Sequence, residues 1–230
     1  CYHCSNQAKL FVYQPFLDKL GLKTPTTIDE FYTVLKAIKT QDPNGNGKAD
    51  EIPLAGSIIG WSDHVERFLL NSFIYCDLDT DINAGAVSDV GFLMNNGKVD
   101  TAVNKAAFRE GLAFINKLYR EGLLYNGSFT QDSSQLTQLV ESSAQPTVGF
   151  VAGGWRGQFS TIGGDRFNNY RAIAPLKGPK GEQNSVVFFQ NPGIGRVVVS
   201  SKSPYADAIM RYFDFMYSLE GTLLQRNGFE

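Results

Sequence analysis

The sequence predicts an α/β fold, and three observations support this prediction. Helix signals recur from one end of the chain to the other, and short β-rich runs bounded by Gly, Pro or Asn lie among them. No internal repeat or low-complexity linker divides the chain. Its 230 residues, 43% hydrophobic and 19% charged, can bury a sizeable core without disulfide or metal staples. Collagen, coiled-coil and disordered classes are therefore excluded.

Five helices are predicted from capping residues and from apolar side chains at helical spacing. Thr27 and Glu30 form a capping box at the start of the first helix. Gly122 is placed to end the third helix in a left-handed conformation. Ser203 followed by Pro204 marks the start of the last helix, as an N-cap with proline at the first helical position. The predicted helices span residues 28–39, 62–75, 105–121, 134–141 and 204–220.

Strand signals lie mainly in the second half of the chain, in runs rich in β-branched and aromatic residues. The predicted strands span residues 147–151, 170–174, 185–189 and 194–200. Residues 176–184, rich in Gly, Lys and Pro, are the best candidate for a domain boundary. A hairpin loop would have the same composition, so both readings stay open at this point.

The charge balance and the apolar runs exclude two classes of partner. The chain has 21 Lys and Arg against 23 Asp and Glu, so a broad basic surface for nucleic acid is not expected. The longest apolar stretch, residues 68–76, is far shorter than the ~20 residues that a bilayer span needs. Residues 1–4 lack the charged start and apolar stretch of a signal peptide. Either the protein is cytosolic, or its leader is absent from this chain.

Residues 42–53 follow the first predicted helix and have the pattern of an EF-hand calcium loop. Oxygen-bearing side chains stand at loop positions 1, 3, 5 and 9, and Gly47 stands at position 6, where the chain turns sharply. Position 12 is Pro53 in place of the usual glutamate, and Glu51 is the obvious substitute ligand. The predicted calcium ligands are Asp42, Asn44, Asn46, the backbone carbonyl of Lys48, Asp50 and Glu51.

Proline at position 12 forbids a second helix that starts as in a true EF-hand, so the expected site is structural and not a sensor. The alternative reading of this loop is a polar Asn-Gly double turn with its carboxylates in solvent. Three carboxylates and two amides in the required register make us favour calcium.

Two tryptophans in glycine-rich segments form a second candidate site. Gly60-Trp61-Ser62-Asp63-His64 opens a predicted helix, and Gly153-Gly154-Trp155-Arg156-Gly157 directly follows a predicted strand. An indole beside free backbone amides and a polar side chain suits a sugar, whose apolar face stacks on the ring. The alternative is that each tryptophan belongs to the core. The predicted ligand contacts are Trp61, Asp63, His64, Trp155 and Arg156.

Signatures of catalysis are sparse in the sequence. Neither His3 nor His64 lies in a G-x-S-x-G or H-E-x-x-H context, so a serine triad and zinc hydrolysis have little support. Asp63, Glu66 and Asp165 could meet in space as glycosidase carboxylates, but no spacing singles them out. We therefore do not expect an enzyme.

The order of these motifs resembles the extracellular solute-binding proteins of carbohydrate ABC transporters, in the branch of alginate-binding and lipoprotein-anchored oligosaccharide-binding proteins. The resemblance begins at Pro15–Phe31 and continues through the calcium loop to Asp50–Leu54. It covers nearly the whole chain. The later matching segments are Asn104–Glu121, Val148–Trp155, Tyr170–Gly178, Val197–Ala208 and Tyr217–Gly221.

This resemblance implies a type II periplasmic-binding-protein-like fold, in which two α/β lobes joined by a hinge capture a sugar and deliver it to a membrane permease. It implies that the calcium loop takes its last ligand from Glu51, that Trp155 stacks on the sugar, and that Trp61 adds contacts. Residues 1–178 would form mainly the second lobe, and residues 179–230 a return segment that packs on the first lobe. The chain would then be a central portion of such a receptor, without its leader.

The resemblance also implies an extracellular, cell-surface or periplasmic protein, tied to the membrane only by a lipid anchor outside this chain. The first competing hypothesis is a calcium-dependent cell-surface interaction module that uses the same loop for adhesion. The second competing hypothesis is a glycoside-active enzyme.

Overall fold

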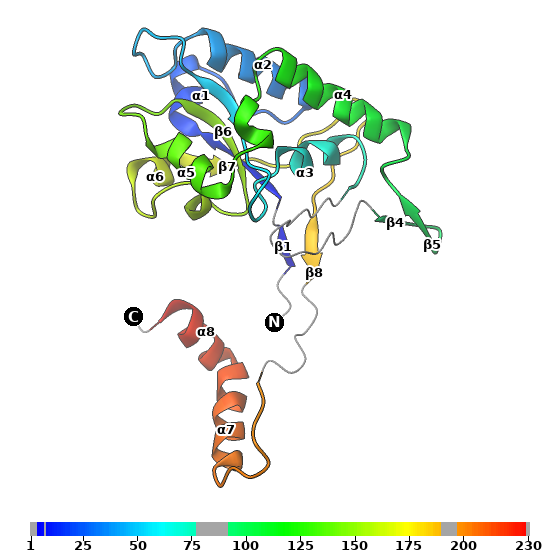
Figure 1. Ribbon diagram of the computed structural model, residues 1–230, viewed down its shortest axis with the longest axis vertical. Helices are drawn as coiled ribbons and strands as arrows, with labels where there is room; N and C mark the ends of the chain where they lie inside the picture. Colours follow the sequence, from blue (N-terminus) through cyan, green and yellow to red (C-terminus); the bar gives the residue numbers. More distant parts are fainter. Residues whose placement is uncertain (1–3, 7, 77–91, 190–196, 229–230) are drawn as a thin grey trace. The chain divides into compact units, whose positions relative to one another are not determined.

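The computed structural model describes residues 4–6, 8–76, 92–189 and 197–228, and it confirms the α/β class (Figure 1). The chain divides into two compact units, which are described separately. One unit is His3–Phe189, and the other is Gln190–Glu230 together with Cys1–Tyr2. The expected calcium loop and all of the expected sugar contacts fall in the first of these units.

The unit His3–Phe189 contains most of the strands and helices. Its strands are β1 (Cys4–Asn6), β2 (Lys9–Tyr13), β3 (Ile52–Ala55), β4 (Phe92–Asn95), β5 (Lys98–Thr101), β6 (Val148–Gly153), β7 (Tyr170–Ala172) and β8 (Val187–Phe189). Its α-helices are α1 (Gln14–Leu20), α2 (Ile28–Thr40), α3 (Val65–Leu69), α4 (Ala106–Arg120), α5 (Ser133–Glu141) and α6 (Asp165–Asn169). Short 3₁₀ turns cover η1 (Leu70–Ser72), η3 (Asn126–Phe129) and η4 (Arg156–Gln158).

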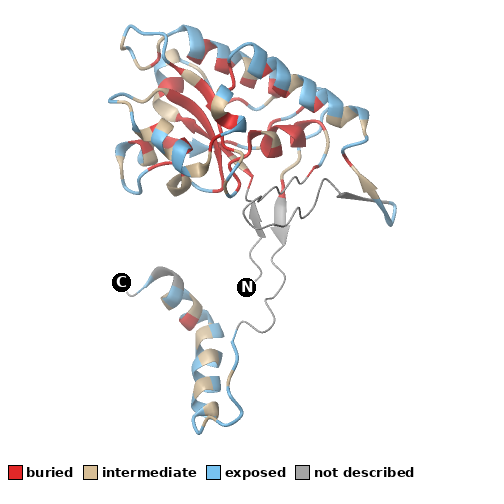
Figure 2. Cartoon of the chain, viewed as in Figure 1, coloured by how far each residue is buried: buried red, intermediate tan, exposed pale blue. Residues whose placement is uncertain are grey.

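A mixed four-stranded sheet with the order β3-β6-β2-β7 is the centre of this unit. β6 pairs parallel to β3, with Leu54 opposite Phe150, and antiparallel to β2, with Lys9 opposite Gly153. All six residues of β6 are buried, as expected of a strand that has neighbours on both edges and cover on both faces (Figure 2). Two smaller sheets pair β1 with β8 and β4 with β5.

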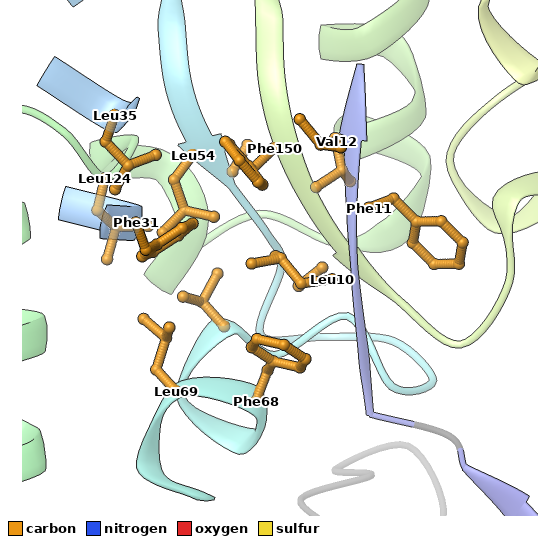
Figure 3. Packing of buried hydrophobic residues seen from close by; sticks show 14 of the residues in the cluster. Leu10, Phe11, Val12, Phe31, Leu35, Leu54, Phe68, Leu69, Leu124 and Phe150 are labelled. Carbon is orange, nitrogen blue, oxygen red and sulfur yellow. The ribbon is translucent and has the colours of Figure 1, made fainter. Parts of the chain in front are cut away.

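One face of the sheet packs against α2 and α3. Phe31 and Leu35 of α2 lie against Leu54 and Phe150, and the rings of Phe31 and Phe150 meet edge to face at 5.0 Å (Figure 3). Phe68 of α3 belongs to the same cluster. These residues are almost fully buried, and each contributes roughly 1.5–3 kcal/mol of transfer free energy relative to an exposed side chain.

The other face of the sheet is covered mainly by aromatic side chains. Phe11 points away from the α2 side, and its ring lies 5.4 Å from that of Phe159 (Figure 3). Tyr170 contacts both Phe159 and Tyr13, and its hydroxyl donates to the carbonyl oxygen of Val148 at 2.8 Å. Successive residues of β2 therefore pack on opposite faces of the sheet, as the period of a strand requires.

Several helix predictions are confirmed within a residue or two. α2 begins at the predicted capping box, in which the Thr27 hydroxyl accepts from the Glu30 amide and the Glu30 carboxylate accepts from the Thr27 amide. α4 and α5 match the predicted segments, and Gly122 has the predicted left-handed conformation, with φ 66°.

The predicted helix 62–75 is too long at its start and is replaced by α3 and η1. Ser62 has φ 62°, a left-handed value incompatible with helix continuation. At the other end, the Asn71 amide donates to the carbonyl oxygens of Arg67 and Cys76 and accepts from the Cys76 amide. This side chain competes with backbone hydrogen bonds and ends the helix.

The last two predictions differ from the structure. Residues 197–200 are not a strand in the described part of the chain, and residues 194–196 lie outside the described residues. The predicted helix 204–220 is two helices, α7 (Ala206–Tyr217) and α8 (Leu219–Asn227). Ser218 is extended, with ψ 163°, and its side chain accepts from the Gly221 amide, so it ends one helix and caps the next.

Among the described residues, no helix has both the length and the apolar character required to cross a bilayer. In the second unit, the described helix α7 has no buried residue (Figure 2).

Replacing Thr27 by alanine should lower the free energy of unfolding by about 1 kcal/mol, because one backbone amide at the start of α2 loses its partner. Urea unfolding monitored by circular dichroism measures this loss. Thr33→Ala is the matched control, since Thr33 is exposed within the same helix and its hydroxyl bonds only to the Asp29 carbonyl oxygen. Equal losses in both variants would contradict the capping role.

Candidate functional site

The two tryptophans lie in loops that follow neighbouring parallel strands. Trp61 follows β3, and Trp155 follows β6. Because β3 and β6 run parallel and pair directly, their carboxyl ends meet at one edge of the sheet. In α/β proteins ligands bind in the crevice outside such strand ends. The sheet therefore brings together two residues that are 94 positions apart in sequence (155 − 61 = 94).

Both indoles are half exposed and rest on glycine backbone. Trp61 is 44% exposed and Trp155 is 47% exposed. A Cβ atom added to Gly154 would lie 2.3 Å from the Trp61 ring, and one added to Gly157 would lie 2.3 Å from the Trp155 ring. Any larger residue at these positions would displace an indole. The alternative reading, that each tryptophan belongs to the core, does not fit this exposure.

Asp63 is buried beneath the Trp61 loop and is fully inaccessible to solvent. Its Oδ2 accepts a 2.6 Å hydrogen bond from the hydroxyl of Ser133, at the start of α5. Ser133 also donates its backbone amide to the carbonyl oxygen of Ile59 at 3.0 Å. These contacts attach the Trp61 loop to α5. The structure thus places Asp63 behind the indole surface, as a support of the loop.

His64 is also buried, with 3% exposure, and its Nδ1 lies 3.5 Å from Oε1 of Glu66. Burial by itself lowers the pKa of His64, but the hydrogen bond and charge of Glu66 and the charge of Asp63 outweigh it and raise the pKa. The ring is therefore engaged by protein groups of its own segment.

Arg156 directs its guanidinium toward α6 and β7. It donates to the carbonyl oxygen of Phe167 at 3.0 Å, and its Cζ lies 4.4 Å from the centre of the Phe167 ring. It also lines a surface hollow of about 650 Å³ together with Asn168 and Arg171. Of the five predicted ligand contacts, Trp61 and Trp155 are the pair that the structure brings together at the surface.

Two further residues of the site were missed by sequence reasoning. Lys9 starts β2 opposite Gly153, and its Nζ donates to the Gly154 carbonyl oxygen at 2.7 Å. Gln158 accepts from the Gly154 amide at 2.9 Å and donates to the Trp61 carbonyl oxygen. Both residues act on main-chain atoms, which leave no pattern in a sequence. Proximity to Trp155 was the one signal that could have pointed to Gln158.

The predicted calcium loop lies at the opposite end of β3, between α2 and the first residue of the strand. Asp42, Gly45 and Gly47 all have positive φ, which folds the loop tightly. Oδ1 of Asp42 accepts from the Asn46 amide at 3.1 Å, and Oδ2 accepts from the Gly47 amide at 2.9 Å. The Gly47 bond first, and then the Asn46 bond, lower the pKa of Asp42.

Asp50 and the two asparagines close the loop with their own side chains. Asn44 Nδ2 and Asn46 Nδ2 both donate to the Asp50 carboxylate, at 3.0–3.2 Å. Asn46 Oδ1 accepts from the Lys48 amide at 2.7 Å, an Asx-turn contact. Among the described residues, no group of three or more His, Cys, Asp or Glu side chains converges closely enough to hold a metal ion.

Glu51 is the unusual member of the loop, because its carboxylate is buried without a partner. The residue is 8% exposed, and neither carboxylate oxygen has a hydrogen-bond partner among the described residues. Burial, the largest cause, raises the pKa of Glu51; the nearby backbone amides of Glu51 and Asn44 oppose this shift, and the charges of Asp42 and Asp50 add to it. A buried carboxylate beside two other acids is unfavourable, and a divalent cation would relieve that cost. The oxygen types in this loop are those that calcium prefers, although the described side chains do not converge as a formed metal site.

Residues 5–222 match the family model described as "Bacterial extracellular solute-binding protein". Over 217 residues the chain is 29% identical to the fructooligosaccharide ABC transporter substrate-binding protein FusA of Streptococcus pneumoniae, a match that covers 90% of this chain and 36% of FusA. It is 27% identical to lipoprotein LipO of Bacillus subtilis, covering 96% of this chain and 43% of LipO. The chain thus spans less than half the length of the curated relatives that it matches.

Solved structures agree with the fold. An HMO-binding, ABC-transporter-associated solute-binding protein from Bifidobacterium longum infantis superposes with a TM-score of 0.69 at 27% identity, covering 99% of this chain and 45% of that one. FusA superposes with a TM-score of 0.65 at 25% identity, covering 99% of this chain and 43% of FusA, in a structure described as an EF-hand mutant in complex with fructo-nystose. These neighbours support a type II periplasmic-binding-protein-like fold.

Replacing Ser133 by alanine should lower the free energy of unfolding by about 1–3 kcal/mol, because the buried Asp63 carboxylate loses its hydroxyl donor. Denaturant titration measures the change. Ser134→Ala is the matched control on the same helix, where the residue is exposed, and it should change stability by less than about 0.5 kcal/mol. If Ser133→Ala left the free energy of unfolding unchanged, the hydrogen bond from α5 would not stabilise the buried Asp63 carboxylate.

Proposed function

The chain belongs to the bacterial extracellular solute-binding protein family, and on that premise we propose that it is part of the substrate-binding component of an ABC importer. Its ligand is a sugar or an oligosaccharide. The protein captures this ligand without changing any bond and delivers it to a membrane permease. The curated relatives FusA, LipO and their solved neighbours support this role, since those with a described function are substrate-binding components and not enzymes.

The observation that carries the proposal is the pair of half-exposed indoles at the carboxyl ends of β3 and β6. An indole offers a flat apolar face on which the C–H face of a sugar stacks, while nearby polar groups take its hydroxyls. Trp155 provides the main stacking surface, and Trp61 adds a second. Asp63 and His64 support the Trp61 loop from the interior. Arg156 adds a polar ligand contact from the side of α6.

Membership of this family also supports a proposal for the lobe organisation. We propose that residues 1–178 form mainly the second lobe and that residues 179–230 return toward the first lobe. The protein works outside the cytoplasm, at the cell surface or in the periplasm, and a lipid anchor outside this chain holds it to the membrane. The lipoprotein relative LipO supports this location.

The calcium loop has a structural role in this proposal. Asp42, Asn44, Asn46, the Lys48 carbonyl, Asp50 and Glu51 hold one Ca²⁺, which supplies the positive charge that the buried Glu51 lacks. Carboxylate, amide and carbonyl oxygens of these residues would supply the ligands that such an ion prefers. The loop stands at the amino end of β3, so the ion stabilises the sheet and does not touch the sugar.

A calcium-dependent adhesion module and a glycoside-active enzyme remain the competing hypotheses. No observation in the described residues favours either of them over sugar capture.

Calorimetric titration of the chain with neutral oligosaccharides, kestose among them, should detect binding, and Trp155→Ala should weaken it roughly tenfold or more through loss of the stacking face. Tyr119→Ala is the control, because Tyr119 is an aromatic residue of similar exposure on α4. No heat with any oligosaccharide, or unchanged affinity in Trp155→Ala, would contradict the proposal. Turnover of a glycan, or binding of proteins alone, would favour a competing hypothesis.

Calcium should raise the melting temperature of the chain over that in chelator, with a stabilisation of about 2.7 kcal/mol at a hundredfold excess over Kd. Glu51→Gln should have two opposite effects. It should raise the melting temperature in chelator, because a buried, unpartnered charge is removed, and it should abolish most of the calcium increment. Differential scanning calorimetry measures both.

Glu110→Gln is the control for this experiment, since Glu110 is an exposed acid on α4 that pairs with Lys180 at 2.8 Å. It should keep the full calcium increment. If calcium left the melting temperature of the parent chain unchanged, the calcium proposal would be contradicted. The loop would then be the polar Asn-Gly double turn.

A further inference from the structure

We propose that Gln158 is a positioning residue that joins the Trp61 and Trp155 loops into a single preorganised sugar-binding surface. This inference rests on the proposed function of the two indoles. Gln158 itself touches main-chain atoms and need not contact the sugar. Its side chain is the one described link that bonds to both tryptophan-bearing loops at once.

The side-chain amide of Gln158 uses both of its ends. Oε1 accepts from the Gly154 amide at 2.9 Å, directly before Trp155, and Nε2 donates to the carbonyl oxygen of Trp61. A glutamine supplies one acceptor and one donor group at a fixed separation, which this bridge requires. When either loop moves, it must therefore break one of these hydrogen bonds or move the other loop with it.

The backbone of Gln158 is itself held in place on two sides. Its amide donates to the Trp155 carbonyl oxygen at 3.2 Å, within η4, and its carbonyl oxygen accepts from the hydroxyl of Thr137 on α5 at 3.1 Å. The same helix contributes Ser133, which holds Asp63 beneath the Trp61 loop. The bridge is thus anchored to a helix and not to another loop.

The packing of the rings supports the same coupling. The Trp61 ring rests on Gly154, the residue whose amide Gln158 binds. The Trp155 ring rests on Gly157, the residue before Gln158. Each indole therefore packs against the backbone segment to which Gln158 bonds or belongs. The positive φ of Ser62, unusual for a residue other than glycine, shows that the Trp61 loop also needs external contacts to keep its shape.

Preorganisation of this kind matters for affinity. A large side chain that is mobile before binding must be ordered when the ligand arrives, and this lowers affinity. Loss of the bridge leaves both indoles in the chain, and it leaves Gly154 and Gly157 unchanged beneath them. It should nevertheless weaken sugar binding by about three- to tenfold.

Fluorine NMR on chain labelled with fluorotryptophan tests the coupling without any ligand. The sequence has two tryptophans, so two signals are expected, and Trp61→Phe and Trp155→Phe assign them. Gln158→Glu keeps the acceptor for Gly154 but sets a carboxylate against the Trp61 carbonyl oxygen. It should shift and change the width of the Trp61 signal, with a smaller effect on Trp155. Gln158→Ala, which removes both bonds, should affect both signals.

Gln138→Glu is the matched control, because Gln138 is an exposed glutamine on α5 that lines a hollow with Tyr125 and Leu139. It should leave both signals unchanged. The same variants are then titrated with kestose, and the Gln158 variants should bind about three- to tenfold more weakly while their melting temperatures stay near that of the control. Restored affinity in Gln158→Asn is not expected, because the shorter amide cannot span both loops.

The outcomes separate the two proposals. Unchanged fluorine signals in both Gln158 variants would overturn the positioning role, whether or not sugar binds. Perturbed signals with no binding of any oligosaccharide by the parent chain would retain the coupling and contradict the proposed function. Sugar affinity that falls only in step with the melting temperature would show that Gln158 merely stabilises the fold, and would also overturn the inference.

Discussion

The parallel pairing of β3 with β6 is the constraint on which the rest of the site depends. Leu54 faces Phe150 across this pair, and both side chains are fully buried against α2. A slip of one residue would turn these side chains to the opposite face, so burial fixes the register. Once the register is fixed, the two strands end together. The loops that carry Trp61 and Trp155 then emerge side by side, although they are far apart in sequence.

The same strand separates two kinds of chemistry. At its amino end stands the acidic loop, where Glu51 is buried without a partner among the described residues, and at its carboxyl end stands the exposed Trp61. β3 has four residues, and at ~3.3 Å per residue it spans more than 10 Å. Under the proposed function, a cation in the loop would act on sugar binding only through the stability of the strand and its register with β6.

Sequence reasoning succeeded where a local pattern decides the structure. The Thr27–Glu30 capping box and Gly122 depend on contacts within a few residues, and both are confirmed. It did not identify β2, because Lys9–Tyr13 is a short apolar run without turn residues at both ends, and its two pairings are both long-range. The predicted strand at 194–200 shows the converse error. Residues 197–200 have β-prone side chains, but the described residues provide no ladder for them.

The candidate site shows the same division. Trp61 and Trp155 could be selected from their glycine-rich context, and their exposure agrees with that selection. Asp63 and His64 were chosen as neighbours in sequence, yet the sharp turn at Ser62 directs them into the interior. Gln158 and Lys9 act through main-chain atoms of Gly154, and such contacts leave no pattern in the sequence.

Saturation-transfer NMR between the indole protons and a bound oligosaccharide tests the central claim most directly. Selective irradiation of the indole protons of Trp61 and Trp155 should transfer saturation to the ring C–H protons of the sugar, more strongly than to its exocyclic groups. That pattern is the one expected of a sugar stacked on the strand-end indoles. Binding without transfer from either indole would contradict the account, because the ligand would then lie elsewhere on the molecule.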